Sequence, residues 1–365
     1  MQAIQQTKMP LLGKSYTLKS PRLRSLTDLQ QEVLSEILAE DSDSDYENVP
    51  CLCGSISSIS ISEIDRYGLP YHKVLCLKCG LLRVSPRWSE FRYQHFYQYQ
   101  YRKLYTPKFN SVSEFILSVA ENSWTQTISQ WVKLCVANYY PQDSPIKIVE
   151  IGSGGGWNLA SLPSSWHRIG YDVDHDFLTT GYELFGLEMK YGFLEDALND
   201  IRNANVILLS HVLEHFLDPL QRLQEIANNI QPSALLLVEV PGIFRLHRTN
   251  LDPMSYMQSA HTYTFCSQTL KSLCMRAGFE VLEIDETIRV VCKIRLSKEV
   301  LHSEQTAQLK QSNSLASAIM RYLILCEKGF RIYTSLKPFS LKRWSLANLW
   351  KILYFPLLRF FVPRR

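Results

Sequence analysis

The sequence predicts an α/β fold built on a doubly wound parallel sheet, with a smaller segment before it and a helical segment after it. Short apolar runs alternate with helical patterns from residue 146 to residue 285, and a glycine cluster follows the first run. Strands that alternate with helices form parallel sheets. A glycine-rich turn between a strand and a helix is typical of a nucleotide-binding site.

Residues 146–174 contain the strand, the glycine loop and the second strand around which the rest of the predicted fold is arranged. The run 146–151 is apolar and rich in β-branched residues, which indicates a strand buried on both faces. The glycines that follow, Gly152, Gly154 and Gly156 among them, let the backbone turn tightly and approach a ligand. A helix is expected from Trp157, with its first amides facing that ligand. A second strand ends at Asp172, where a carboxylate can accept hydrogen bonds from a ribose.

The alternation continues beyond residue 174. It predicts further strands over residues 188–191, 205–210, 234–240 and 278–285, and helices over residues 178–185, 217–230 and 268–277. Ligands of such sheets bind beyond the carboxyl ends of the strands. The glycine loop, Asp172, the turn at residues 193–196 and residues 210–215 all follow strands, so we expect them at this one edge.

Composition sets limits on the class of protein. The chain has 365 residues, of which 46% are hydrophobic and 20% charged, as in an ordinary globular protein. A net charge of +4 gives little support to a dedicated nucleic-acid binder, and no DNA partner is expected. We find no basic-then-apolar signal segment at Met1 and no run of about eighteen apolar residues. A cytoplasmic protein with reduced cysteines is therefore expected.

The flanking segments are predicted from periodicity and charge. Residues 1 to about 21 lack clear periodicity, which predicts a mobile arm, and residues 23–38 favour an amphipathic helix. Residues 39–48 have the composition of a solvated acidic linker. One long helix is expected over residues 115–140, leading into the first strand, and residues 298–338 look helical.

Four cysteines predict a metal site. Cys76 and Cys79 form C-x-x-C-G, a turn that lets two thiolates point at one ion, and Cys51 and Cys53 form a tighter first pair. Four thiolates would close a tetrahedral structural zinc site that stabilises a segment with little core of its own. Free buried thiols are the alternative. A catalytic redox pair is less favoured because no thioredoxin-like context surrounds it.

Glu150 precedes the glycine loop and completes E-x-G-x-G-x-G. This pattern resembles the first motif of class I S-adenosylmethionine-dependent methyltransferases, whose sheet is Rossmann-like. The resemblance implies that Asp172 binds the ribose, that the turn containing Glu195 contacts the adenine edge, and that Ser210 lies at the same edge. A purely structural strand–turn–helix and a nicotinamide-binding domain are the alternatives, although the glycine spacing departs from G-x-G-x-x-G.

A second resemblance concerns the acceptor. The C-x-x-C-G turn, the following strand, Pro86 and the tyrosine-rich run at residues 96–102 resemble the zinc-binding sugar C-methyltransferases and polysaccharide-cluster methyltransferases, over roughly residues 50–290. The stretch from His211 also resembles this family's H-V-L-E-H-x-x-D-P motif, which implies that His211 faces the methyl-donor pocket. The same letters match H-x-x-E-H, a zinc-protease pattern, but they directly follow a predicted strand.

His261 is the second candidate catalytic residue. The family carries a Tyr-His-Glu-His-type segment here, in which the glutamate and the last histidine are implicated in proton abstraction. Aligned on His261, this chain has Gln258, Ser259 and Ala260, so the histidine is present and the glutamate absent. Carbon methylation needs a base beside a carbonyl, whereas one histidine near neutral pKa could assist oxygen methylation. A loop histidine bonded to backbone is the alternative.

The C-terminal residues 341–365 interleave aromatic and aliphatic residues with Lys and Arg, and Pro356 interrupts them. They are too interrupted to span a bilayer but could lie at the anionic inner face of a membrane. Packing on the protein itself or on a second subunit is the other interpretation.

Together these observations predict an arm, helix and acidic linker over residues 1–48, a zinc-binding domain over 49–108, a class I methyltransferase domain over 109–296 and a helical extension over 297–365. We expect a methyltransferase that uses S-adenosylmethionine and carries structural zinc. The expected acceptor is a small molecule, such as a sugar or sugar nucleotide, methylated on oxygen or carbon. An RNA methyltransferase that reads RNA through the zinc domain, and a non-catalytic scaffold, are the alternatives. The oligomeric state is left open.

Overall fold

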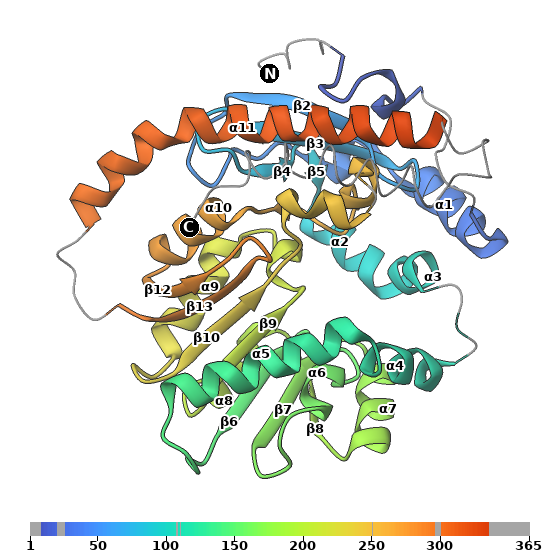
Figure 1. The fold of residues 1–365 in the computed structure, drawn as a ribbon. Coiled ribbons are helices and arrows are strands. Elements are labelled where there is room, and N and C mark those ends of the chain that lie inside the picture. The colour runs from blue at the N-terminus through green and yellow to red at the C-terminus, as the bar shows by residue number, and fades with distance from the viewer. Residues whose placement is uncertain are drawn as a thin grey trace. The chain divides into compact units, whose positions relative to one another are not determined.

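The computed structural model describes residues 9–19, 26–106, 109, 111–249, 251–295 and 301–335 (Figure 1). The basic-aromatic tail predicted over residues 341–365 lies outside the described residues. The chain folds into two compact units. Of the described residues, those within 1–107, 241–269 and 299–365 form one unit, and those within 108–240 and 270–298 form the other.

A seven-stranded sheet organises the second unit, and it confirms the predicted α/β class. Its order is β12-β13-β10-β9-β6-β7-β8. The strands β6, β7, β8, β9 and β10 run parallel, whereas β13 is antiparallel to both β10 and β12. Their bounds are β6 Lys147–Ile151, β7 His167–Asp172, β8 Glu188–Tyr191, β9 Val206–Ser210, β10 Leu235–Glu239, β12 Phe279–Ile284 and β13 Arg289–Ile294.

Helices cover both faces of this sheet (Figure 1). They are α4 Val112–Ala120, α5 Ser123–Tyr139, α6 Trp157–Ala160, α7 His175–Phe185, α8 Leu194–Ile201, α9 Pro219–Asn229 and α10 Ser267–Arg276. Apolar residues of α5, such as Ile128 and Val132, pack against Ile148, Leu208 and Leu237 of the strands. Strands that are apolar on both faces need such a cover, which explains their continuous apolar runs.

The prediction of a single long helix over residues 115–140 is wrong. Two helices, α4 and α5, occupy this stretch, and Asn122 lies between them. The side chain of Asn122 accepts a hydrogen bond from the backbone N–H of Trp124 at 2.8 Å, which caps α5. Asn is a preferred N-cap residue because its side-chain oxygen satisfies an otherwise unbonded amide.

The first unit is built on a smaller antiparallel sheet of order β11-β4-β3-β2. Its strands are β2 Ser58–Ile64, β3 Pro70–Cys76, β4 Leu82–Val84 and β11 Tyr263–Thr264, and a separate pair joins β1 Tyr46–Glu47 to β5 Arg87–Trp88. The helices are α1 Asp28–Glu40, α2 Glu90–His95, α3 Tyr101–Tyr105 and α11 Leu301–Ser335, with η1 Lys14–Tyr16, η2 Asp43–Asp45, η3 Phe96–Gln100, η5 Ile243–Thr249 and η6 Pro253–Tyr256.

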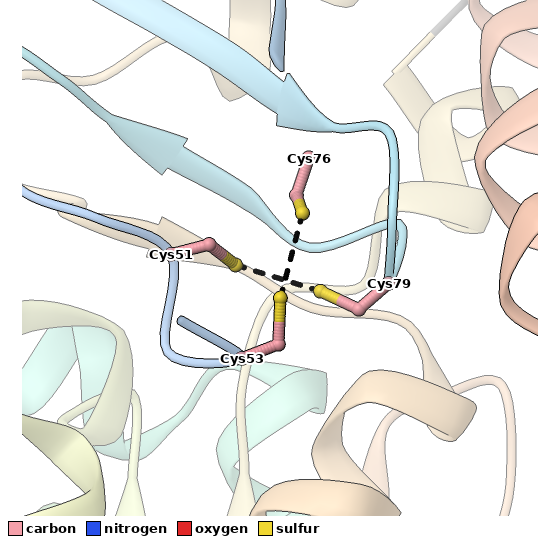
Figure 2. Close-up of side chains that lie close together, drawn as sticks. All are labelled: Cys51, Cys53, Cys76 and Cys79. Atoms are coloured by element: carbon pink, nitrogen blue, oxygen red, sulfur yellow. Dashed lines mark hydrogen bonds between the residues drawn. The ribbon is translucent and has the colours of Figure 1, made fainter. Parts of the chain in front are cut away.

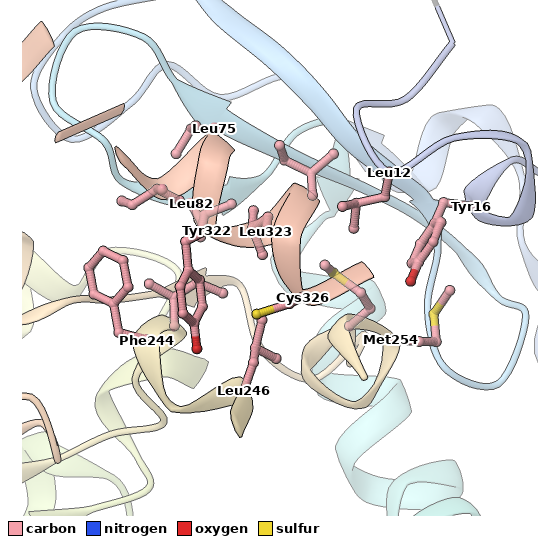
Figure 3. Packing of buried hydrophobic residues seen from close by; sticks show 14 of the residues in the cluster. Leu12, Tyr16, Leu75, Leu82, Phe244, Leu246, Met254, Tyr322, Leu323 and Cys326 are labelled. Carbon is pink, nitrogen blue, oxygen red and sulfur yellow. The ribbon is translucent and has the colours of Figure 1, made fainter. Parts of the chain in front are cut away.

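The core of this unit joins segments that are far apart in the sequence. Figure 3 shows side chains of the sheet, of η5 and η6 and of α11 in one cluster, including Leu75, Leu82, Phe244, Met254, Tyr322 and Leu323. Leu12 and Tyr16 are buried in the same cluster. The prediction of a mobile arm is therefore wrong for residues 9–19, because two apolar side chains bind this segment to the core.

The acidic linker predicted over residues 39–48 is also corrected. Asp41 accepts hydrogen bonds from Arg92 Nε at 2.7 Å, Trp88 Nε1 at 3.1 Å and the Tyr46 hydroxyl at 2.7 Å. The residues Tyr46 and Glu47 form strand β1. Negative charge alone suggested solvation here, but a buried guanidinium supplies a partner for the carboxylate. None of the helices described is long and apolar enough to cross a membrane.

Candidate functional site

The point at which the strand order of the large sheet reverses is the expected place for a ligand. The central strand β6 has β7 on one side and β9 on the other, and the chain leaves β6 into the glycine loop. In open α/β sheets the crevice outside the carboxyl ends at such a point receives the ligand. The structure therefore places the glycine loop, Asp172, Ser210 and His211 at the carboxyl ends of the parallel strands.

The glycine loop has the backbone conformation that only glycine adopts readily. Gly152 and Gly154 have φ values of 66° and 54°. A Cβ on Gly152 would lie 2.4 Å from a methyl group of Val212, and one on Gly154 would lie 2.1 Å from the ring of Trp157. Gly156, also left-handed, is the N-cap of α6. The loop can thus present its backbone to a ligand where side chains would block it.

Glu150 lies at the floor of this loop and is 1% exposed. Its Oε1 accepts a hydrogen bond from Asn158 Nδ2 at 2.6 Å. Burial raises the pKa of Glu150 to about 8; the Asn158 hydrogen bond opposes this shift and the charge of Asp172 adds to it. A positively charged group bound beside this carboxyl would lower its pKa and favour the carboxylate.

Asp172 is bonded to the loop and to its own turn. Its Oδ2 accepts the backbone N–H of Gly154 at 2.7 Å, and its Oδ1 accepts those of Val173 and Asp174 at 2.8 and 3.0 Å. These three bonds hold the carboxylate in place beside the loop. The structure thus brings Glu150, the glycines and Asp172 together, as the spacing in the sequence suggested.

Glu195 and Ser210 occupy different surroundings. Ser210 is buried at the end of β9. Glu195 lies in the first turn of α8, and its carboxylate forms an ion pair with Arg222 of α9. The backbone N–H of Phe193 at this turn is capped by Asp196 at 2.9 Å. The turn itself therefore follows β8 at the sheet edge, while the Glu195 side chain is engaged with a neighbouring helix.

His211 follows β9 in a left-handed conformation, with φ of 55°. Its backbone N–H donates to the carbonyl of Glu239 at 2.9 Å. Its Nδ1 lies 3.4 Å from Glu214 Oε1, and its Nε2 lies 4.0 Å from Glu239 Oε2. Both carboxylates are buried, whereas the imidazole is 43% exposed. His211 therefore combines a left-handed backbone at a strand end with a ring that lies near two buried carboxylates.

The metalloprotease alternative does not fit this geometry. His211 lies outside any helix, and His215 ends a three-residue 3₁₀ helix, Leu213–His215. The protease pattern needs its two histidines on one face of a continuous helix.

The residues at the loop fit S-adenosylmethionine. Among the described side chains, Glu150 Oε2, Ser153 Oγ and Asn158 Oδ1 are buried polar atoms without a hydrogen-bond partner. Such atoms are few in folded proteins and point to a bound ligand or water. The carboxyl of Glu150 suits an ammonium group, and the Asp172 carboxylate suits ribose hydroxyls. Sequence reasoning missed Ser153 and Asn158; their place inside and just after the glycine loop was the available signal.

A second candidate centre lies in the first unit, where four cysteine sulfurs converge (Figure 2). The Sγ atoms of Cys51 and Cys79 are 3.5 Å apart, and those of Cys53 and Cys76 are 3.6 Å apart. The four ligand atoms lie within 4.8 Å of one another. Sulfurs of a tetrahedral site with Zn–S bonds of about 2.3 Å would be about 3.8 Å apart, whereas a disulfide requires about 2.05 Å.

The local backbone explains how these sulfurs meet. The N–H of Gly54 donates to the Cys51 carbonyl at 2.7 Å, and that of Gly80 to the Cys76 carbonyl at 2.9 Å. These bonds fold each pair into a tight turn. Hydrogen bonding by Cys51 lowers the pKa of Cys53 to about 6, while hydrogen bonds from its three neighbours raise the pKa of Cys79. A bound cation would allow all four cysteines to ionise together, and the donor set suits zinc.

His261 belongs to the first unit, where it is 9% exposed. Its backbone carbonyl accepts hydrogen bonds from the Tyr71 hydroxyl at 3.1 Å and from Lys73 Nζ at 3.4 Å. Its N–H donates to the carbonyl of Gln258 at 2.9 Å. The backbone bonding expected for a loop histidine is thus present, and it fixes the backbone of His261.

This chain is similar to a known protein family and to several solved structures. Residues 123–284 match the family model described as a methyltransferase domain. None of the curated protein sequences compared with this chain matches it. Among solved structures, the CurJ carbon methyltransferase is similar at 15% identity and a TM-score of 0.42, over 53% of this chain and 60% of that one.

Two further structures are similar. One is a complex of the Haloferax volcanii Trm112 methyltransferase activator with a methyltransferase, with 17% identity and a TM-score of 0.35 over 48% of this chain and 79% of that one. The other is the O-methyltransferase NcsB1 from neocarzinostatin biosynthesis, with 18% identity and a TM-score of 0.36 over 55% of this chain and 66% of that one. The chain thus spans less than two thirds of the first and third of these structures.

The family model thus places a methyltransferase domain over residues 123–284, and the second unit has the Rossmann-like sheet expected of such a domain.

Proposed function

We propose that this protein transfers a methyl group from S-adenosylmethionine to a sugar or polysaccharide precursor, with nucleotide-linked sugars as the first acceptors to test. The observation that carries the cofactor part is the cradle at the sheet edge. There the glycine loop, the unpartnered carboxyl oxygen of Glu150 and the carboxylate of Asp172 meet. The acceptor class rests on the resemblance of residues 50–290 to zinc-binding sugar methyltransferases.

Each residue at the edge has a role in this proposal. Glu150 would bind the ammonium of the methionine portion and Asp172 the ribose, while Ser210 and the turn that contains Glu195 would border the adenosyl group. When bound, the cofactor supplies an activated methyl group on a sulfonium. The protein then has to orient the acceptor in line with that methyl group and exclude water, so positioning supplies much of the rate.

His211 and His261 are the groups proposed to act on the acceptor. The absence of a glutamate at Ala260 favours oxygen methylation, in which one imidazole can accept the hydroxyl proton as the new bond forms. The zinc site would be structural, because four thiolates leave no open coordination position.

Incubation of the purified protein with methyl-labelled S-adenosylmethionine and a panel of nucleoside diphosphate sugars, polysaccharide fragments and RNA tests this proposal. We expect label in a sugar and none in RNA. The variant His261→Asn should lower turnover without changing cofactor affinity. The matched control is His167→Asn, because His167 lies exposed at the opposite, amino end of β7 and pairs there with Glu188. Label in RNA alone would refute the proposed acceptor, and equal turnover by His261→Asn and the wild type would remove His261 from the mechanism.

A further inference from the structure

The segment that carries His261 is a strand of the small sheet. Tyr263 and Thr264 form β11, which pairs with Arg83 and Leu82 of β4. The N–H of Val84 extends this pairing by donating to the Thr262 carbonyl at 2.9 Å. The residues just before β11 are therefore fixed at one end by a strand that follows directly from the C-x-x-C turn.

The two carbonyls that precede His261 are each bonded by a tyrosine. The hydroxyl of Tyr93 donates to the Ser259 carbonyl at 3.1 Å, and that of Tyr97 to the Ala260 carbonyl at 3.0 Å. The Ser259 hydroxyl in turn donates to the buried carboxylate of Asp65 at 2.8 Å. The tyrosines of this region thus stabilise the segment before His261 by hydrogen bonds to its backbone carbonyls.

The carbonyl of His261 itself receives two donors from β3, at buried positions that are two residues apart and so lie on one face of the strand. Tyr71 donates its hydroxyl at 3.1 Å, and Lys73 donates its ammonium at 3.4 Å. Tyr71 is 2% exposed and Lys73 is 1% exposed. Two donors on one carbonyl oxygen fill both of its lone pairs and leave the peptide little freedom to rotate.

Lys73 is an unusual residue at this place. Within the described part of the chain no carboxylate forms an ion pair with it, and its amine lies 5.4 Å from the centre of the Tyr71 ring. Burial lowers the pKa of Lys73 to about 7. A buried amine with one carbonyl partner is expensive to desolvate, and an apolar side chain of similar length would stabilise the unit at least as well. Stability therefore does not account for a lysine here.

We propose that Lys73 and Tyr71 are positioning residues that fix the backbone of His261 and so hold its imidazole in one orientation. The inference rests on the proposed role of His261 in methyl transfer. A catalytic imidazole displaced by about 1 Å loses as much as 100-fold in rate, so a doubly bonded carbonyl is a direct means of preserving activity.

The variants Lys73→Met and Tyr71→Phe test this inference. Each keeps the shape of the side chain and removes one hydrogen bond to the His261 carbonyl. We expect kcat with the sugar acceptor to fall about 10-fold or more, whereas the affinity for S-adenosylmethionine stays unchanged. The melting temperature of Lys73→Met should stay equal or rise. The control is Lys133→Met, because Lys133 Nζ also bonds a carbonyl, that of Ser161 at 3.2 Å, in the other unit.

Two further measurements decide the mechanism. Combined with His261→Asn, the Lys73→Met change should lower kcat no further than His261→Asn alone, because Lys73 acts through His261. Hydrogen exchange of the backbone amides of residues 258–262 needs no acceptor; it should accelerate about 10-fold in the Lys73→Met/Tyr71→Phe double variant. The amides of β2 should keep their wild-type rates.

The outcomes separate the two proposals. Loss of turnover in His261→Asn with full turnover in Lys73→Met overturns the positioning role and leaves the proposed function standing. Full turnover in His261→Asn removes His261 from the reaction and the positioning role with it. Unchanged exchange at residues 258–262 in the double variant also overturns the inference, since the segment is then held by other bonds.

Discussion

The buried carboxyl of Glu150 predicts that the affinity for S-adenosylmethionine rises with pH. The perturbation is a change of pH, combined with Glu150→Gln. Since burial raises the pKa of Glu150 to about 8, the group is mostly protonated at pH 6. A positively charged ammonium is stabilised by the carboxylate and not by the acid. Binding at pH 6 must therefore release a proton from Glu150.

The magnitude follows from the pKa. The ionised fraction of a group with a pKa near 8 grows from about 1% at pH 6 to about 50% at pH 8. The apparent dissociation constant should fall about 20-fold over this range, because the α-amino group of the cofactor, with a pKa of about 7.8, is itself more than half deprotonated at pH 8. Above about pH 8 the further loss of this proton outweighs the ionisation of Glu150, so the gain should end there.

The stability of the cofactor-free protein changes in the opposite sense. The pKa of Glu150 is higher in the folded protein than its ordinary value of 4.5. The folded state thus holds an extra proton between pH 4.5 and about 8, so the free energy of unfolding decreases across this window and levels off above it. The variant Glu150→Gln removes this decrease.

Calorimetric titration in two buffers of different ionisation enthalpy measures both effects. We expect release of about one proton per bound cofactor near pH 6.5 in the wild type, and none in Glu150→Gln. The control Glu183→Gln replaces an exposed carboxylate on α7 and should behave as the wild type. Equal affinity at pH 6 and pH 8 in the wild type, without proton release, would refute the assignment of Glu150 to the ammonium.

The remaining predictions concern stability and metal content. Gly154→Ala should lose about 1–3 kcal/mol in urea denaturation and all measurable cofactor binding, because its Cβ would meet the Trp157 ring in a left-handed backbone. Gly186→Ala, also left-handed but with nothing within 4 Å, should lose about 1 kcal/mol and bind normally. We expect native mass spectrometry to detect one zinc ion in the wild type and none in Cys79→Ser, whereas Cys135→Ser, which changes a buried thiol of α5, should retain the ion. Asp41→Ala should lose about 3 kcal/mol in urea denaturation, because it removes an acceptor from a buried guanidinium, and an unchanged midpoint would contradict that.

The large sheet could be predicted because its signals are local. Each parallel strand is a short apolar run, and the glycines after β6 and the caps of the helices mark the connections. Two features of this unit that were not predicted, strand β13 and the helix break at Asn122, also have local causes. β13 begins with Arg289, whose guanidinium lies over the rings of Trp124 and Trp131. Because charged residues lie near both ends of this strand, its short buried centre gives a weak apolar pattern. The break at Asn122 escaped notice because the apolar pattern continues across it.

The small unit could be predicted only in part, because its partners are distant in sequence. The spacing of the four cysteines is a local signal and by itself predicts a metal site. Nothing local shows that α11 packs against β3 and β4, or that a strand of two residues, β11, joins β4 across about 180 residues. Contacts of this kind depend on three-dimensional complementarity, which periodicity does not encode.

The path of the chain suggests a division of roles, in which one unit binds the cofactor and the other holds His261. It leaves the large sheet after β10, contributes Pro241–Thr269 to the unit that contains the cysteine cluster, and returns to complete α10, β12 and β13. The cofactor cradle is therefore built wholly from the parallel sheet, while His261 is held by side chains of β3 and η3 and by strand β4. If His261 acts on the acceptor, then the C-x-x-C turn between β3 and β4 supports the reaction through these strands. Removal of zinc should accordingly lower kcat before it lowers cofactor affinity, and a parallel loss of both would argue against this division.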